Sequence, residues 1–247
     1  MTPTVITPGT RVITLGNPGL SIFSGSSGGA AATYQSKVLG YSPIAYWPLN
    51  DAAGTQATEL VNGWHGVSSN VTWGVTGIGD GETAASFNGT NSQINLFSAS
   101  LAAAFGVNEG TLMYWVNPTS DANRRRPFRA TTDNSEVWFS YKDAGGTDMG
   151  LWRIASGTSG YTHAETPGTW FPMFITWSNT VNQVYVIINA TTQGPAAAGS
   201  ASGALNMIVL GTFAPGNFTN PWLGNIANCA VWNSALSAAT IADLAAL

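Results

Sequence analysis

The sequence predicts an all-β protein, an antiparallel β-sandwich that ends in a short helix. Eleven segments of four to nine residues either alternate apolar and polar side chains or form short apolar runs, as strands of a sandwich do. Clusters of Asn and Gly separate several of them, which is typical of turns. No helix of ten residues is indicated before position 238. A chain of 247 residues therefore fits one large sandwich domain and an N-terminal appendage.

The appendage is an arm over residues 1–36, and the sandwich is expected over residues 37–247. Two period-two segments flank Pro8-Gly9-Thr10 and predict a hairpin, and a Gly- and Ser-rich linker follows at 24–29. A hairpin of two strands cannot cover its own apolar side chains. We therefore expect the arm to dock on another subunit, through Val5, Ile6, Arg11, Val12, Ile13 and Leu15.

The strands of the sandwich are placed by their alternation and by the turns that bound them. After one or two helical turns at 34–39, strands are expected at 44–49, 84–87, 93–97, 110–117, 127–131, 136–141, 149–154, 170–178, 183–188, 204–210 and 225–232. Ser237 is a good N-cap for a closing helix over 238–247.

Three segments resemble the frame of laminin-G-like domains of the concanavalin A-like class. Ile44–Asp51 reads IAYWPLND, Ala85–Asn91 reads ASFNGTN, and Leu223–Ser237 reads LGNIANCAVWNSALS. In the family these places read roughly (V/I)AYWPLDE, LSFDGTDDYV and GxIDEVRIYNRALSxxEIxxL, and the residues at 111–118 and 168–177 are similar to two inner strands. The resemblance covers residues 40–247 and implies a jelly-roll sandwich of the kind also found in phage virion proteins.

Composition narrows the classes of function. Only 8% of the residues are charged and the net charge is −4, so a general nucleic-acid-binding surface is not expected. Cys229 is the only cysteine, which excludes an internal disulfide, and its apolar strand pattern predicts a buried thiol. The sequence has neither a secretory leader pattern nor eighteen consecutive apolar residues, so we expect no membrane partner.

Half of the eight basic residues lie within six positions, at Arg124, Arg125, Arg126 and Arg129. The segment is either a solvated loop tip or a contact with an acidic subunit surface or a phosphate, since the guanidinium fork suits both anions.

Catalysis is not expected, although relatives of this class include glycoside hydrolases. Retaining hydrolases of the class place their two carboxylates on one strand as Glu-x-Asp-x-x-Glu, and this run is absent from the sequence. With twelve acids, two histidines and one cysteine, no nucleophile, base and orienting group can be named. The prediction is therefore a protein that is not an enzyme.

Calcium is the ligand that the resemblance implies most directly. The candidate ligands are Asp51, Glu59, Asn88 and Asn91, with Asn62 beside them. Acids of the family are replaced by Asn88 and Asn228, which lowers the expected affinity. The alternative is that these side chains cap turns. His65 and His163 lack metal-ligand spacing, and no other cofactor is expected.

Five aromatic residues in or beside predicted loops are candidates for stacking on sugar rings. They are Trp64, Trp73, Trp152, Tyr161 and Trp222. The alternative for each is packing in the core or against a subunit.

Two functions follow from these patterns. The first is a virion structural protein, a phage capsid decoration or tail-associated subunit anchored by its arm, which forms homo-oligomers and contacts other virion subunits. The alternative is a carbohydrate-binding or adhesion module that recognises host surface glycans. The first interpretation places the protein in the virion after synthesis in the host cytoplasm.

Overall fold

The computed structural model describes residues 33–119, 123–134, 137–144, 148–154, 158–189, 191–199 and 202–247. The predicted arm lies outside the described residues, and so do its expected partner-binding residues Val5, Ile6, Arg11, Val12, Ile13 and Leu15.

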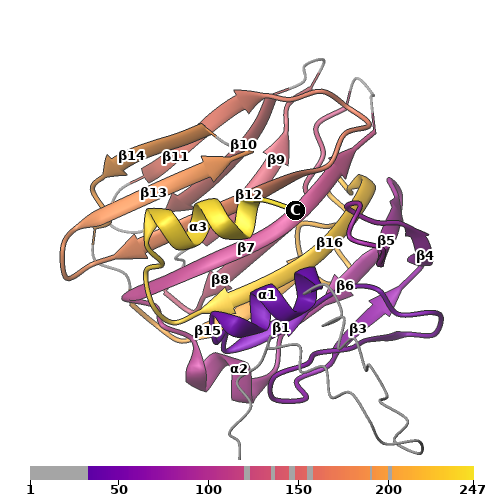
Figure 1. The fold of residues 1–247 in the computed structure, drawn as a ribbon, viewed down its shortest axis with the longest axis horizontal. Helices are drawn as coiled ribbons and strands as arrows, with labels where there is room; N and C mark the ends of the chain where they lie inside the picture. Colours follow the sequence, from indigo (N-terminus) through magenta and orange to yellow (C-terminus); the bar gives the residue numbers. More distant parts are fainter. Residues whose placement is uncertain are drawn as a thin grey trace, which may run out of the picture. The chain divides into compact units, whose positions relative to one another are not determined.

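The described chain folds as two antiparallel sheets of eight strands each, which confirms the predicted sandwich (Figure 1). We call them sheet A and sheet B. In sheet A the order is β14 (Thr191–Ala196), β13 (Gln183–Ile188), β12 (Phe171–Ser178), β7 (Glu109–Pro118), β16 (Leu223–Trp232), β5 (Thr83–Asn88) and β4 (Thr72–Thr76), and β1 (Ala45–Trp47) also pairs with β16. In sheet B it is β11 (Thr158–Ala164), β10 (Asp148–Ile154), β9 (Val137–Lys142), β8 (Phe128–Thr132), β15 (Leu205–Leu210), β6 (Gln93–Asn95), β3 (Gly66–Ser69) and β2 (Gln56–Ala57).

The main core lies between the two sheets and is rich in aromatic rings. Trp138 from sheet B and Trp177 from sheet A meet with ring centroids 5.1 Å apart, and Phe105 packs edge-on against Trp138 at 5.3 Å. The guanidinium of buried Arg153 lies 5.6 Å from the Trp138 ring and donates to the Asn179 side chain. Most tryptophans are therefore core residues, because the inward side of each strand has to fill the space between the sheets.

Two helices cover the outer face of sheet A, α1 (Tyr34–Gly40) and α3 (Ala238–Ala245) (Figure 1). Tyr34 donates to the carbonyl of Leu244 at 2.6 Å and accepts from the Trp115 indole at 2.7 Å. Helix α1 spans the boundary predicted between residues 36 and 37, and its Tyr34 is buried in this second core. The predicted N-cap of α3 is confirmed, since Ser237 Oγ accepts from the Thr240 amide at 3.1 Å.

All eleven predicted strands are present, and the elements that the sequence did not indicate lie mostly at sheet edges. The unpredicted strands β14 and β4 end sheet A, β11 and β2 end sheet B, and β3 is next to β2. Edge strands bury few side chains, so their sequences are rich in Thr, Ser and Gly and carry little alternation. The short helix α2 (Ala99–Ala104) was also missed.

Candidate functional site

The outer face of sheet B carries a group of three aromatic side chains, Phe139, Tyr141 and Trp152, which we call the aromatic face. On β9, Trp138, Ser140 and Lys142 point into the core, and the alternate residues Phe139 and Tyr141 point outward and are half-buried. Trp152 lies opposite Phe139 in the register of β9 and β10. Strand pairing therefore places the three rings side by side.

Two glycines allow the Trp152 ring to lie flat on the sheet. A Cβ on Gly160, its direct neighbour on β11, would fall 2.0 Å from Trp152 Cε3. A Cβ on Gly150 would fall 2.7 Å from Trp152 Nε1. The ring thus occupies the space where two side chains would stand.

The aromatic rings are nearly parallel. The planes of Trp152 and Tyr141 differ by 5° with centroids 6.3 Å apart, and those of Tyr141 and Phe139 differ by 20° at 6.2 Å. Trp152, which lies over two glycines beside these rings, provides the flat apolar surface that stacks on the apolar face of a planar or ring-shaped ligand.

Four arginines border the aromatic face, and they differ in what they contact. Arg124 is exposed, pairs with Asp143 at 3.1 Å and lies 5.1 Å from the Tyr141 centroid. Arg125 donates to the carbonyls of Gly89 and Pro221 at 2.9 and 3.0 Å, so it holds two loops together. This arginine segment is a built contact network and more than a solvated loop tip.

Arg126 and Arg129 share one aromatic ring, that of Phe213. Their guanidinium carbons lie 4.9 and 4.1 Å from its centroid, and Arg126 also lies 5.4 Å from the Phe139 centroid. Burial, together with the smaller effect of the charges of Arg129 and Arg124, lowers the pKa of Arg126 to about 10. Burial also lowers the pKa of Arg129. Both groups are therefore partly desolvated cations held close together.

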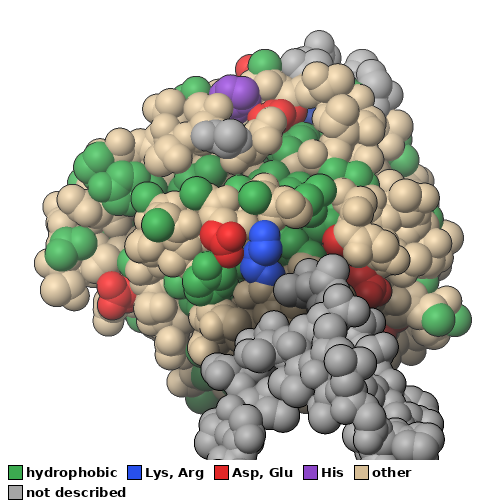
Figure 2. All heavy atoms as spheres, in the orientation of Figure 1, with side chains coloured by type: hydrophobic (Ala, Val, Ile, Leu, Met, Phe, Trp, Pro, Cys, Tyr) green, Lys and Arg blue, Asp and Glu red, His purple; other side chains and the backbone are tan. Residues whose placement is uncertain are grey.

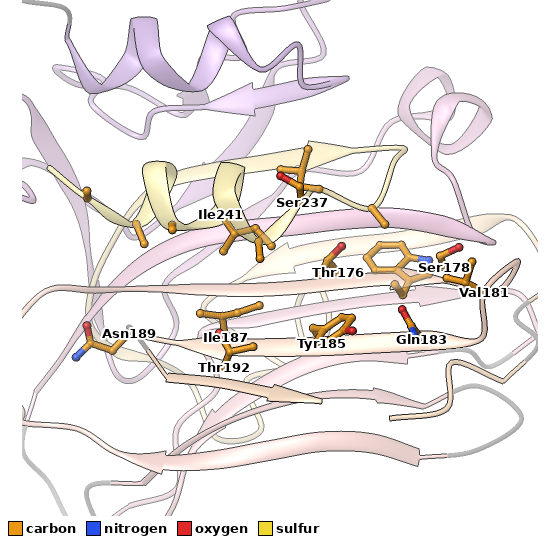
Figure 3. A pocket seen from close by; sticks show the side chains of 17 residues that line it. Thr176, Ser178, Val181, Gln183, Tyr185, Ile187, Asn189, Thr192, Ser237 and Ile241 are labelled. Atoms are coloured by element: carbon orange, nitrogen blue, oxygen red, sulfur yellow. The ribbon is translucent and has the colours of Figure 1, made fainter. Parts of the chain in front are cut away.

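A separate groove of about 630 Å³ lies on the outer face of sheet A, between α3 and strands β12, β13 and β14 (Figure 3). Tyr185, Ile187 and Gln183 line one side, and Ile241 lines the other. Figure 2 shows this face, where hydrophobic side chains gather around α3 and charged ones are few. Polar side chains such as Gln183, Thr192 and Ser237 also line the groove, but none of the parallel ring pairs lies among its lining residues, so we take the aromatic face as the better candidate for a carbohydrate site.

The acids proposed as calcium ligands bind backbone amides instead. Glu59 is 3% exposed and its carboxylate accepts from the amides of Tyr46, Val61, Asn62 and Trp64 at 2.7 to 3.1 Å. Asp51 accepts from the amide and hydroxyl of Thr58. These contacts are those of side chains that hold a loop.

The asparagines of the expected calcium site occupy turns and a bulge. Asn88 accepts from the amides of Thr90 and Asn91 at 2.8 and 3.0 Å and donates to the Asn91 side chain. Asn228 has a positive φ of 53° at a β-bulge in β16, and Tyr46 donates to its side chain. In the described part of the chain, no three His, Cys, Asp or Glu side chains gather as a metal site.

Removal of calcium is expected to leave the stability almost unchanged. The candidate oxygens already accept hydrogen bonds from the protein, so an ion would have to displace them. We expect the melting temperature in excess EGTA to match that in millimolar calcium within about 1 °C, because only a bound ion stabilises the fold by mass action. A fall of several degrees in EGTA, reversed by calcium and not by magnesium, would contradict this expectation.

The five aromatic candidates from the sequence do not form one site. Trp152 alone lies on the aromatic face. Trp64 is partly buried against the core, and Trp73 is half-buried on β4 and donates to the Gly54 carbonyl at 2.9 Å. Tyr161 lies opposite Leu151 on β11 and packs against the core.

Trp222 corrects the expectation of a loop-borne sugar platform. It is fully buried in the main core, and its backbone is held on both sides, since its amide donates to the Gly211 carbonyl and its carbonyl accepts from the Gly89 amide. Phe139, Tyr141 and Phe213 were missed as site residues. The alternation at 136–141 marked Phe139 and Tyr141 as facing away from Trp138, but no sequence pattern showed which face was exposed.

His163 joins the two sheets at the open edge of the sandwich. Its Nδ1 lies 2.9 Å from the carboxylate of Glu165 and its Nε2 lies 3.2 Å from the hydroxyl of Thr191 on β14. The order hydroxyl, imidazole, carboxylate resembles that of a hydrolase triad. However, Glu165 also accepts from Asn189, and Thr191 stands within a strand, so we interpret the group as a link between β11 and β14.

Two further predictions from the sequence concern the burial of Cys229 and the absence of a membrane-spanning segment. Cys229 is buried as predicted, and burial raises the pKa of its thiol, which keeps it in the unreactive protonated form. None of the described helices is both long and apolar enough to cross a bilayer.

Comparison with protein families agrees with the observed fold. A family model described as the concanavalin A-like lectin/glucanases superfamily matches residues 88–242. The chain belongs to this superfamily, as the resemblance in its strands predicted. No curated protein matches the sequence.

Solved structures with a similar fold share little sequence with this chain. Domain 4 of AbnA, a GH43 extracellular arabinanase from Geobacillus stearothermophilus solved with arabinotriose, is 20% identical with a TM-score of 0.58, over 83% of this chain and 98% of that chain. The receptor binding domain of botulinum neurotoxin C/D mosaic serotype is 12% identical with a TM-score of 0.62, over 81% and 50%. Trypanosoma rangeli sialidase in complex with sialic acid is 11% identical with a TM-score of 0.62, over 81% of this chain and 32% of that chain. The chain thus spans about a third of the sialidase and half of the toxin domain.

Proposed function

We propose that this protein is a carbohydrate-binding module that binds glycans on the aromatic face of sheet B. The observation that carries the proposal is the Trp152 ring, which lies flat over Gly150 and Gly160 and parallel to Tyr141. A sugar ring has an apolar face of C–H groups that stacks on such a platform, and neighbouring polar side chains orient its hydroxyls.

The similar solved structures are consistent with this proposal. The arabinanase domain that spans nearly the same fold was solved with a trisaccharide, and the toxin domain is a receptor-binding domain. The sequence identity to both domains is too low to assign their ligands to this chain. The two structures support the fold, and they support the class of ligand only by analogy.

The absence of catalysis and the place in a virion stay predictions from the sequence. A non-enzymatic module is expected because the sequence lacks the paired-acid strand motif, and Glu59 and Asp143 hold a loop and pair with Arg124. Attachment to other virion subunits through the arm does not conflict with glycan binding, since the aromatic face and residues 1–36 are separate parts of the sequence.

Replacement of Trp152 by alanine tests the proposed site. The assay is electrophoresis in gels that contain a neutral or an acidic polysaccharide, arabinan among them. We expect at least one of these polymers to retard the unmodified protein. Trp152→Ala should weaken that binding about tenfold or more, because the stacking surface is lost. Trp73→Ala is the matched control, since it removes a half-buried indole from the other sheet and should leave binding unchanged.

Two results would contradict the proposal. One is the absence of retardation with every polysaccharide tested. The other is equal binding by Trp152→Ala and the unmodified protein, which would place any glycan site elsewhere.

A further inference from the structure

The arginine pair beside the aromatic face holds positive charge that the described protein does not neutralise. Within the described residues, neither Arg126 nor Arg129 has a carboxylate at ion-pair distance, whereas exposed Arg124 is paired with Asp143. The side chain of Arg126 makes no hydrogen bond to any described residue, and its Nε is buried without a partner. Arg129 donates from Nη1 to the Phe213 carbonyl at 3.0 Å. The remaining desolvated donors of the pair favour a bound anion.

Strand register places this pair next to the platform. Trp152 on β10 pairs with Phe139 on β9, and Phe139 pairs with Arg129 on β8, so the three side chains form one row across the sheet. Two inter-strand spacings separate the ends of the row, a span of about 10 Å. Arg126 lies over Phe139, the middle member of the row. A ligand stacked on Trp152 therefore reaches Arg126, which covers Phe139, and Arg129 at the end of the row.

The charge is unusual for this chain. The net charge is −4 and the protein has only eight basic residues, of which four lie in this one segment. Mutual repulsion among Arg124, Arg126 and Arg129 costs free energy in the free protein, which an anionic ligand would remove. A neutral sugar would leave that repulsion in place.

We propose that the ligand of the aromatic face is an acidic glycan that stacks on Trp152, and that Arg126 and Arg129 bind one of its carboxylate or sulfate groups. This inference rests on the proposed carbohydrate-binding function and narrows its class of ligand. The two arginines act as a fork for the anion, and Trp152 and Tyr141 supply the apolar contact.

Matched pairs of polysaccharides test this inference. Polygalacturonate and its fully methyl-esterified form share a backbone and differ in charge, and dextran sulfate and dextran do the same for sulfate. At low salt we expect the charged member of at least one pair to bind about tenfold more tightly, since hydrogen bonds to charged groups are the strong ones. That preference should decline as salt is added. The carboxylate pair and the sulfate pair distinguish the two anions.

Arginine variants test which side chains bind the anionic group of the glycan. Arg126→Gln combined with Arg129→Gln should remove the preference, so that the charged and the neutral polymer bind within about twofold of each other. Lys37→Gln is the control, because it removes one positive charge from α1 on the opposite sheet and should keep the preference. If the double variant is unstable, the single variant Arg129→Gln and the salt titration of the unmodified protein test the same point.

The outcomes separate the two proposals. Equal binding of charged and neutral polymers, with both lost in Trp152→Ala, would overturn the inference and leave the proposed function standing. A preference that survives Arg126→Gln with Arg129→Gln would also overturn the inference. Failure of every polymer to bind would contradict the proposed function itself.

Discussion

Replacement of Trp138 by alanine is expected to lower the free energy of unfolding by about 3–5 kcal/mol. Trp138 is fully buried between the sheets, where it contacts Phe105, Trp177 and the guanidinium of Arg153. Its removal leaves a cavity that rigid strands cannot fill, and Arg153 loses an aromatic neighbour. Urea denaturation monitored by circular dichroism measures the change.

The adjacent residue provides the control. Phe139 lies next to Trp138 on the same strand but on the outer face, where it is half-buried. Phe139→Ala should therefore cost less than about 1.5 kcal/mol. Equal losses for the two variants would contradict the assignment of which face of β9 is the core.

Gly160→Ala is expected to weaken glycan binding about as much as loss of the Trp152 ring, which is about tenfold or more. The added methyl group would lie 2.0 Å from Trp152 Cε3 and within 3 Å of two further ring atoms, so the indole has to rotate off the sheet. The variant keeps every aromatic side chain and every charge. It therefore tests the flat orientation of the ring separately from its presence.

Gly40 provides the matched control. Binding is measured in the same polysaccharide gels as for Trp152→Ala. Gly40, at the end of α1 on the other sheet, has no atom within 4 Å of an added Cβ. Gly40→Ala should therefore bind normally. Normal binding by Gly160→Ala, with an unchanged melting temperature, would show that the ring need not lie flat and would remove the main support for the platform.

The fold could be predicted from the sequence because its central strands carry the pattern of burial directly. Strands such as β7 and β12 are buried along almost their whole length, and their apolar runs mark them without any tertiary information. The edge strand β14 could not be predicted in this way, although it pairs with the adjacent strand β13, because most of its side chains are exposed and its sequence TTQGPA has no apolar alternation.

The sequence by itself determined the sandwich, the capped closing helix, the buried cysteine and the concentration of arginines in one segment, because each depends on local pattern or composition. Tertiary structure decided the rest. Glu59 is a candidate metal ligand by sequence, and only the tertiary structure shows that four backbone amides, one from β1 and three from the following loop, donate to its carboxylate. The Trp152 ring can lie flat on the sheet only because strand pairing places Gly160 beneath it. Arg129 lies in the same row of side chains because β8 pairs with β9. Trp152 and Gly160 are only eight positions apart, and Arg129 and Phe139 ten, but the register of each strand pair decides which side chains meet, and the local sequence pattern does not fix that register.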